Sequence, residues 1–370
     1  MPDRNDRGVM EGGGYYAAHS DPQRGSAAPA LPMLERAAAE AALPPPGAPL
    51  VVADMGAAQG RNELEPLSLA VRGLAARRSP GTPISSSIPT LPGNDFGSLF
   101  ALVEGDPGSY LREAGDVYPY VAGRSFYGRL FPDDHLTLGW TAIAVHWLSG
   151  VPAALPGTVY SEFATGGVAE AFRERARRDW LAFLSCRARE LRPGGELVVV
   201  GGAAAPDGSS GAAPLLGTLS AEARAMVDAG ELSAAELARM TVPTWNRTPD
   251  EFAEPFREGA VALELVELEA SQLPDRFLAA LERDGDREAF AAAVTGFVRA
   301  FTEPSLLAAL DPGRDPAERR RIGDELYERV RARAAARPED VRADWRVVAM
   351  RIRRPAAVRG SRSRRRPATA

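Results

Sequence analysis

The segment from residue 50 to residue 62 constrains the fold of this chain more than any other. Residues 50–54 (LVVAD) are a short apolar run that ends on an acid, and residues 55–62 (MGAAQGRN) follow before a helical pattern that reaches about residue 77. An apolar strand, a glycine-containing turn and a helix form the first unit of an open α/β sheet. We therefore predict an α/β fold with a Rossmann-like sheet.

The same turn indicates a ligand. Gly56 and Gly60 let a ligand approach the backbone, and the following helix begins with free N–H groups. The segment is not GxGxxG and has no P-loop lysine, which weakens the dinucleotide and P-loop interpretations. An acid just before the first glycine, here Asp54, is what methyltransferases place near the amino acid portion of S-adenosylmethionine (SAM). An ordinary strand-turn-helix junction would look the same, so the pattern alone leaves both interpretations open.

Apolar runs and periodicity predict the other elements. Strands are expected at 83–89, 117–122, 135–140, 196–202, 260–268 and 345–352, and helices at 31–42, 168–191, 219–242 and 275–337. Pro193-Gly194-Gly195 should end the helix 168–191, and residues 201–211 read as a flexible loop. Asp95 is predicted to cap a helix N-terminus rather than to bind a ligand.

Composition excludes several classes of protein. The apolar fraction of 45% is too high for global disorder, and no apolar run reaches the roughly 18 residues of a membrane span. A single cysteine, Cys186, excludes an internal disulfide framework and a multi-cysteine zinc site, and we expect an inert buried thiol there. The charged N-terminus carries no signal-peptide core. We therefore expect a soluble cytoplasmic protein without a membrane partner.

The charge distribution argues against nucleic-acid binding. All 44 basic residues are arginine, which together with the Ala, Gly and Pro bias indicates a GC-rich bacterial genome. The whole chain carries −5 and residues 351–366 hold eight arginines and no acid, so the remainder carries −13. An acidic body does not suit a nucleic-acid surface, and the arginine-rich tail is expected to be a solvated, disordered extension.

Five ordered segments resemble one enzyme family. They are YAAHSDPQ (16–23), ADMG (53–56), LPGNDF (91–96), SFYGRLFP (125–132) and HWLSGVP (146–152). In this order and spacing they resemble the SABATH methyltransferases, which include plant salicylate, jasmonate and benzoate carboxyl methyltransferases and the caffeine-pathway N-methyltransferases. The resemblance runs from about residue 10 to 310, because RAFTEP (299–304) also looks like a family segment.

The resemblance implies a role for individual residues around the cofactor SAM. Asp54 and Asn62 match residues that hold the amino acid portion of SAM, with Gly56 in the turn between them. Tyr16 matches a tyrosine that closes over the cofactor. The residues matching the ribose and adenine contacts are Thr90, Leu91, Ser125 and Phe126.

A second set of residues matches the acceptor site. Gln23 and Trp147 correspond to the pair that hydrogen-bonds the substrate carboxylate, and His146 adjoins them. A carboxylate is already anionic at pH 7, so its methylation needs alignment and exclusion of water rather than a general base. Two neutral donors can orient such an anion without the stronger hold of an arginine. We expect helical segments 219–242 and 275–310 to build part of this pocket over the sheet edge.

The chain also departs from the family pattern. Thr90 stands where the family usually has an aspartate that binds the ribose hydroxyls, which implies either a lower cofactor affinity or another acid in that role. The stretches that carry magnesium ligands in some members lack them here, at 155–157 and 238–241. We predict no metal.

These observations predict a SAM-dependent methyltransferase that esterifies a small, largely apolar carboxylic acid. The alternatives are N-methylation of a flat heterocycle on the same scaffold, and a cofactor-binding protein without catalysis. The resemblance implies a homodimer. The predicted division is an N-terminal lid segment and helix (1–48), a Rossmann-like core (49–205), a helical cap with a late strand (206–337), a final core strand (338–354) and the disordered tail (355–370).

Overall fold

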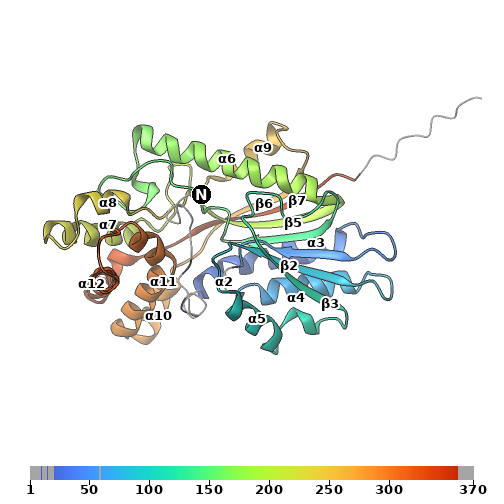
Figure 1. The fold of residues 1–370 in the computed structure, drawn as a ribbon, viewed down its shortest axis with the longest axis horizontal. Coiled ribbons are helices and arrows are strands. Elements are labelled where there is room, and N and C mark those ends of the chain that lie inside the picture. The colour runs from blue at the N-terminus through green and yellow to red at the C-terminus, as the bar shows by residue number, and fades with distance from the viewer. Residues whose placement is uncertain (1–9, 11–14, 16–20, 58–59, 357–370) are drawn as a thin grey trace, which may run out of the picture.

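One seven-stranded sheet organises the chain in the computed structural model, which describes residues 10, 15, 21–57 and 60–356 (Figure 1). The order is β3-β2-β1-β4-β5-β7-β6. The strands are β1 (Leu50–Asp54), β2 (Ile84–Thr90), β3 (Val117–Gly123), β4 (Leu136–Ala142), β5 (Leu191–Ala203), β6 (Glu264–Gln272) and β7 (Arg346–Arg353). β1 to β5 pair in parallel, whereas β7 is antiparallel to both of its neighbours. The predicted α/β sheet is confirmed, and its order reverses between β1 and β4, where open sheets bind ligands.

The prediction placed the boundary between the long helix and β5 wrongly. β5 begins at Leu191 rather than at residue 196, because Leu191 already pairs with Leu136. The Pro193-Gly194-Gly195 segment, expected to separate the two elements, lies in an irregularity inside the strand, where Gly194 has φ of +76°. At its other end β5 pairs with β7 as far as Ala203, so the loop expected at 201–211 begins three residues later.

Helices cover both faces of the sheet. On one face, α3 (Leu31–Glu40), α4 (Leu64–Ala75) and α5 (Phe96–Gly105) contribute to a core with Val52 and Leu138. On the other, α6 (Gly166–Glu190) and α9 (Pro249–Arg257) pack against β5 and β7. α9 was not predicted, although Thr248 and Glu251 form a capping box at its start. Asp95 is confirmed as a cap, since its carboxylate accepts a hydrogen bond from the Ser98 N–H at 3.0 Å.

The remaining helices form a cap beside the sheet (Figure 1). They are α7 (Ala213–Asp228), α8 (Ala234–Arg239), α10 (Arg276–Asp284), α11 (Arg287–Ala308) and α12 (Pro316–Ala336), and α7, α8, α11 and α12 share one core. The single helix predicted over 219–242 is wrong: α7 ends before Gly230, which has φ of +76°, and a capping box of Ser233 and Glu236 starts α8. The helical region predicted at 275–337 consists of three helices. β6 lies in the main sheet, and the division into domains remains a prediction.

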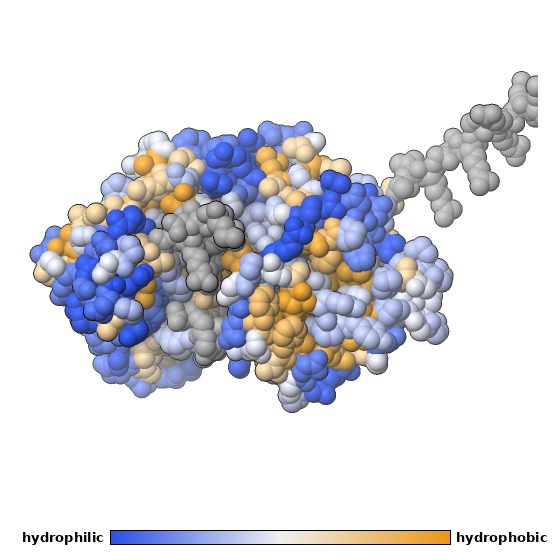
Figure 2. Space-filling view, in the orientation of Figure 1, coloured by the Kyte–Doolittle hydropathy of each residue, from blue (hydrophilic) through white to orange (hydrophobic). Residues whose placement is uncertain are grey.

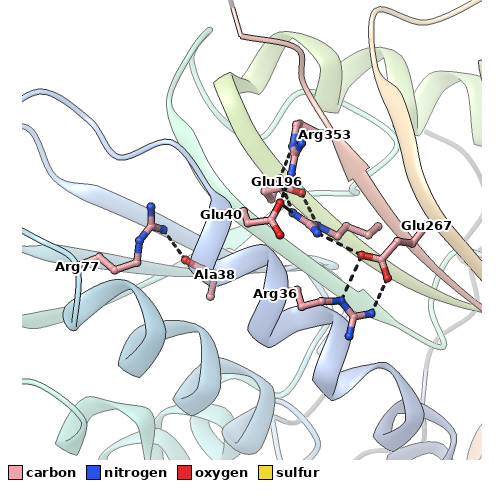
Figure 3. Close-up of polar contacts among 8 residues, drawn as sticks. Arg36, Ala38, Glu40, Arg77, Glu196, Glu267 and Arg353 are labelled. Carbon is pink, nitrogen blue, oxygen red and sulfur yellow. Dashed lines mark hydrogen bonds and ion pairs between the residues drawn. The ribbon is translucent and has the colours of Figure 1, made fainter.

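A group of charged residues joins the late strands to α3, and Figure 3 shows its members Glu40, Glu196 and Glu267. Arg351 on β7 is 2% exposed and contacts the carboxylates of Glu196 at 3.0 Å, Glu40 at 2.6 Å and Glu267 at 3.2 Å. Arg353 reaches Glu196 and Glu40 as well. Burying charges is costly unless they are paired, and here the guanidinium has three acidic partners.

The surface mixes hydrophilic and hydrophobic residues. Figure 2 shows hydrophobic residues exposed over α5, where Phe100 is 46% exposed. No helix in the described part of the chain is both long and apolar enough to cross a membrane.

Candidate active site

The glycine turn after β1 lies at the switch point of the sheet. The Met55 N–H donates to the Trp140 carbonyl at the end of β4, and the Gly56 N–H donates to the Pro89 carbonyl at the end of β2. Gly56 has φ of +99°, and a Cβ there would lie 2.7 Å from the Cβ of Ala144. Only glycine fits this close approach. The turn is therefore fixed between the ends of three strands.

Two acids meet beneath this turn. Asp54 ends β1 and is 4% exposed, and burial raises the pKa of its carboxyl to about 8. Glu63, just before α4, is fully buried, and neither of its carboxylate oxygens has a hydrogen-bond partner among the described residues. Burial and the neighbouring Asp54 charge raise the pKa of Glu63 well above its usual range. Sequence analysis did not identify Glu63, which follows the predicted Asn62 directly.

The other predicted cofactor residues lie on neighbouring segments. Thr90 is buried at the end of β2 and pairs in register with Gly123, so the Leu91 segment runs beside the loop that carries Ser125 and Phe126. The Phe126 ring lies 3.4 Å from where a Gly56 Cβ would be. Asn62 is half-buried in the segment leading into α4. Tyr16 lies outside the described residues, so its predicted role stays untested.

A buried ion pair supports the loop after β3. Arg187 on α6 is fully buried and donates to the carbonyls of Phe126 and Gly128, each at 3.0 Å. Its partner is Glu190, at 2.7 Å, which also accepts from the Leu130 N–H. The Arg187–Glu190 salt bridge therefore holds the loop that carries Ser125 and Phe126, and both charges of the pair are neutralised within the protein. Cys186 on the same helix is only partly buried, whereas a buried thiol was predicted; burial still raises its pKa, which disfavours the reactive thiolate.

The three predicted acceptor residues line one cavity of about 70 Å³. Gln23 comes from α2 (Asp21–Ala27), and His146 and Trp147 come from the loop after β4. The Gln23 Oε1 atom is buried without a hydrogen-bond partner among the described residues. The other described residues around the cavity are Met10, Ser26, Ile143, Tyr160, Gly202, Thr244, Asn246, Phe297, Phe301, Trp345, Arg346 and Val347.

This lining tests the expectation about the cap helices. Phe297 and Phe301 on α11 belong to the segment 275–310, as predicted, but no described residue from 219–242 lines the cavity. Asn246 and Trp345 were not identified from the sequence, because neither lies in a motif or an amphipathic pattern. The cavity is mostly apolar and aromatic, which suits a small apolar acceptor.

His146 is held in one neutral form. Its Nδ1 accepts a hydrogen bond from the Gly202 N–H at 3.4 Å, so the ring proton belongs on Nε2. Burial, together with the nearby positive charge of Arg247, lowers the pKa of His146 to about 3. At pH 7 the imidazole is therefore uncharged and can donate from Nε2.

Arg346 is the one charged residue among the described residues that line this cavity. Among the described lining residues there is no aspartate or glutamate. Nor does the described part of the chain hold a group of three or more His, Cys, Asp or Glu side chains that could bind a metal ion. The absence of a metal remains a prediction.

Comparisons with known proteins agree on a single family. Residues 7–354 match the family model described as SAM dependent carboxyl methyltransferase. The chain is 30% identical over 249 residues to the methyltransferase LUC1 of a Fusarium species, covering 65% of this chain and 64% of that protein. It is 29% identical over 276 residues to salicylate carboxymethyltransferase of Clarkia breweri, covering 70% and 74% respectively. This chain thus spans less than two thirds of the Fusarium relative.

A solved structure supports the same fold. A loganic acid methyltransferase with SAH aligns with a TM-score of 0.77, covering 94% of this chain and 99% of that one. The two sequences are 19% identical, so the likeness bears on the fold alone.

Proposed function

Because this chain belongs to the family of SAM-dependent carboxyl methyltransferases, we propose that it methylates the carboxylate of a small, largely apolar acid. The observation that carries the proposal is the cavity shared by Gln23, His146 and Trp147. Its described lining offers N–H donors and aromatic surface but no acidic side chain. Such a cavity suits an acceptor that arrives as an anion and needs no base.

The residues beneath the glycine turn fit the cofactor. A buried acid without a salt-bridge partner among the described residues, such as Asp54, favours a ligand with a cationic group, and SAM carries an α-ammonium. Gly56 leaves room for close backbone approach, and the aromatic face of Phe126 suits a flat purine. When bound, SAM supplies an electrophilic methyl group on a sulfonium. Thr90, Leu91, Ser125 and Asn62 would complete the contacts, and Tyr16 would close over them.

The acceptor side orients the nucleophile. We assign the Gln23 amide, the Trp147 indole N–H and the His146 Nε2–H as donors to the carboxylate. With SAM bound, one carboxylate oxygen would be the nucleophile for its methyl group, and transfer would give a methyl ester and the thioether S-adenosylhomocysteine. No proton is transferred, so the contribution of these residues is alignment and exclusion of water.

The state of His146 favours a carboxylate over a heterocyclic N–H acceptor. A heterocycle that carries a proton on the reacting nitrogen needs a base, and an imidazole with a pKa of about 3 accepts protons poorly near pH 7. Its Nδ1 is also engaged by the Gly202 N–H. The described lining supplies no carboxylate in its place.

The test is a transfer assay with SAM labelled in its methyl group. Salicylate, benzoate and a series of aliphatic acids serve as acceptors, with xanthine-type heterocycles as the competing class. We expect base-labile label on at least one acid, because methyl esters hydrolyse in alkali. Base-stable label on a heterocycle would establish N-methylation instead. Calorimetric binding of S-adenosylhomocysteine (SAH) without transfer to any acceptor would indicate a protein that has lost catalysis.

The oligomeric state is a separate proposal. A homodimer is supported by the family resemblance only, and light scattering of the purified chain measures it directly. A monomeric mass at micromolar concentration would contradict it.

A further inference from the structure

Arg247 is a buried arginine directly behind the acceptor-binding loop. It is 1% exposed, and it follows Asn246, one of the residues around the cavity. Its guanidinium lies over the rings of Trp180 and Phe252, at 5.9 and 5.6 Å from their centroids. No carboxylate of the described residues comes within 4.0 Å of it, and its Nε has no hydrogen-bond partner there. A buried charge without an acidic partner is costly, so its presence calls for an explanation.

The guanidinium holds main-chain atoms instead. Its Nη1 donates to the Val145 carbonyl at 2.7 Å, and its Nη2 donates to the Ala176 carbonyl at 2.5 Å. Val145 immediately precedes His146 and Trp147. Arg247 therefore connects the acceptor-binding loop to α6.

Tyr127 supports the same loop next to Arg247, because both side chains contact the Val145 carbonyl. Its hydroxyl donates to the Trp147 carbonyl and lies 3.3 Å from the Val145 carbonyl. The other carbonyls of the loop are also engaged: that of Ala144 accepts from the Trp147 N–H, and that of His146 accepts from the Trp245 N–H. The side chains of His146 and Trp147 thus project from a backbone with little freedom to shift.

The acids nearest to Arg247 are occupied elsewhere. Asp179 accepts hydrogen bonds from the Ser149 N–H and hydroxyl, each at 2.7 Å. Glu251 caps the start of α9 by accepting from the Thr248 N–H. His146, on the cavity side, is neutral. The positive charge behind the loop is therefore only partly offset by the protein.

We propose that Arg247 is a positioning residue that holds the His146–Trp147 loop and makes the cavity select anionic acceptors. The acceptor carboxylate is the missing counter-charge, brought within reach by Gln23, His146 and Trp147. Arg247 stays behind the backbone, so its charge acts through the loop rather than by direct contact. This inference rests on the proposed function, because it requires an acceptor that binds as an anion.

The experiment separates charge from backbone support. Binding of benzoate and of its neutral isostere benzamide is measured by calorimetry on the SAH-loaded full-length protein. Arg247→Met removes the charge at similar length, Arg247→Lys keeps it, and Tyr127→Phe removes only a hydroxyl that holds the loop. Arg187→Met is the matched control, since it removes a fully buried arginine of α6 that holds the loop after β3.

The proposal expects a distinct pattern. Wild type should prefer benzoate to benzamide at least tenfold, and Arg247→Met should lose most of that preference while benzamide affinity stays within about threefold. For Arg247→Lys, the logarithm of the ratio of benzoate affinity to benzamide affinity should be at least half of its wild-type value. Tyr127→Phe should weaken both ligands alike, and Arg187→Met should weaken SAH without altering the preference.

Equal loss of both ligands in Arg247→Met would overturn the proposal and leave a purely structural role. No preference for benzoate in wild type would overturn it as well. If Arg247→Met does not fold, Arg247→Lys and Tyr127→Phe decide. The preference for benzoate over benzamide must survive in both variants. If Arg247→Lys loses this preference to the same extent as it loses overall affinity, the proposal is contradicted. Failure of the proposed function looks different, because benzoate would still bind selectively but no acid would receive label.

Discussion

The cofactor side and the acceptor side of the site differ in the ionisable groups that they bury. Beneath the glycine turn, Asp54 and Glu63 are buried acids that no described arginine neutralises within 4.0 Å. Behind the acceptor loop, Arg247 is a buried cation that no described acid neutralises within 4.0 Å. The ligands proposed for the two sides, a cationic sulfonium amino acid and an anionic carboxylate, carry the complementary charges.

The rest of the protein shows that this pattern is local. Arg187 has Glu190, and Arg351 has three acids around it. Where the fold needs a buried arginine for support alone, it provides the counter-charge itself. Among the buried arginines of the described residues, Arg247 alone lacks an acidic partner within 4.0 Å, which agrees with a ligand as its counter-charge.

The largest effect should come from the acceptor side. Trp147→Phe keeps most of the aromatic packing but deletes the indole N–H, and misalignment of about 1 Å can cost on the order of 100-fold in rate. We expect turnover with the best acid to fall by about that factor while SAH affinity stays within about twofold. Trp245→Phe is the control, because Trp245 adjoins the loop but does not line the cavity.

A double variant sharpens this prediction. Gln23→Leu combined with Trp147→Phe should cost less than the sum of the single effects, because both donors act on one group. Fully additive losses in steady-state kinetics would mean that the two side chains do not share a carboxylate. Normal turnover of Trp147→Phe would mean that the Trp147 indole N–H does not orient the acceptor and that the side chain contributes packing alone.

The next largest effect concerns the cofactor side. Asp54→Ala deletes the buried acid proposed to hydrogen-bond the cofactor, and loss of such a charged partner typically costs about 1.5–3 kcal/mol, or roughly 10- to 150-fold in affinity. Asn62→Ala should act in the same direction. Calorimetry with SAH measures both, and Asp95→Asn serves as control because asparagine caps a helix equally well. Unchanged SAH affinity in Asp54→Ala and Asn62→Ala would contradict the cofactor assignment.

The two sides also differed in how far the sequence could predict them. β1 has the bounds predicted from its apolar run, and Asp54 and Gly56 follow it within one local motif. Gln23 and Trp147 are far apart in sequence, and only the family resemblance brought them together before the structure did. Their roles remain predictions, although they line one cavity.

The residues that the sequence did not reveal depend on tertiary packing. Glu63 looks like an ordinary first-turn helix acid until Asp54 and Tyr110 are seen beside it. Arg247 lies in the polar stretch Asn246-Arg247-Thr248, which reads as a surface loop, and its burial follows from the packing of α6 and α9 around it. β5 was predicted to begin five residues too late because Pro193 and two glycines normally end an element, whereas here an irregularity accommodates them.

A smaller effect should be visible as protons released on cofactor binding. With its pKa raised to about 8, Asp54 is mostly protonated at pH 6.5 when no ligand is bound. Binding of an ammonium favours the carboxylate, so SAH binding should release up to about one proton and tighten as pH rises toward 8. Calorimetry in buffers of different ionisation enthalpy counts the protons.

The sign of this effect can be checked on the unliganded protein. The folded state binds more protons at Asp54 than the unfolded chain does between about pH 4 and pH 8, so this group makes stability fall as pH rises through that window. In Asp54→Asn both the proton release and this contribution should disappear. Proton uptake on SAH binding by wild type at pH 6.5 would contradict the assignment.

Deletion of the arginine-rich tail should have the smallest effect. The deletion tests whether selection of anionic acceptors depends only on residues around the cavity. Removing residues 355–370 deletes five arginines at positions 359–366, in a segment with no apolar period to bury. Solvated charges are screened over roughly 8 Å at physiological salt, so we expect the benzoate preference over benzamide not to change. The melting temperature should stay within about 2 °C. A loss of several degrees would show that the tail docks on the acidic body, and a weakened benzoate preference would mean that distant arginines share the role assigned to Arg247.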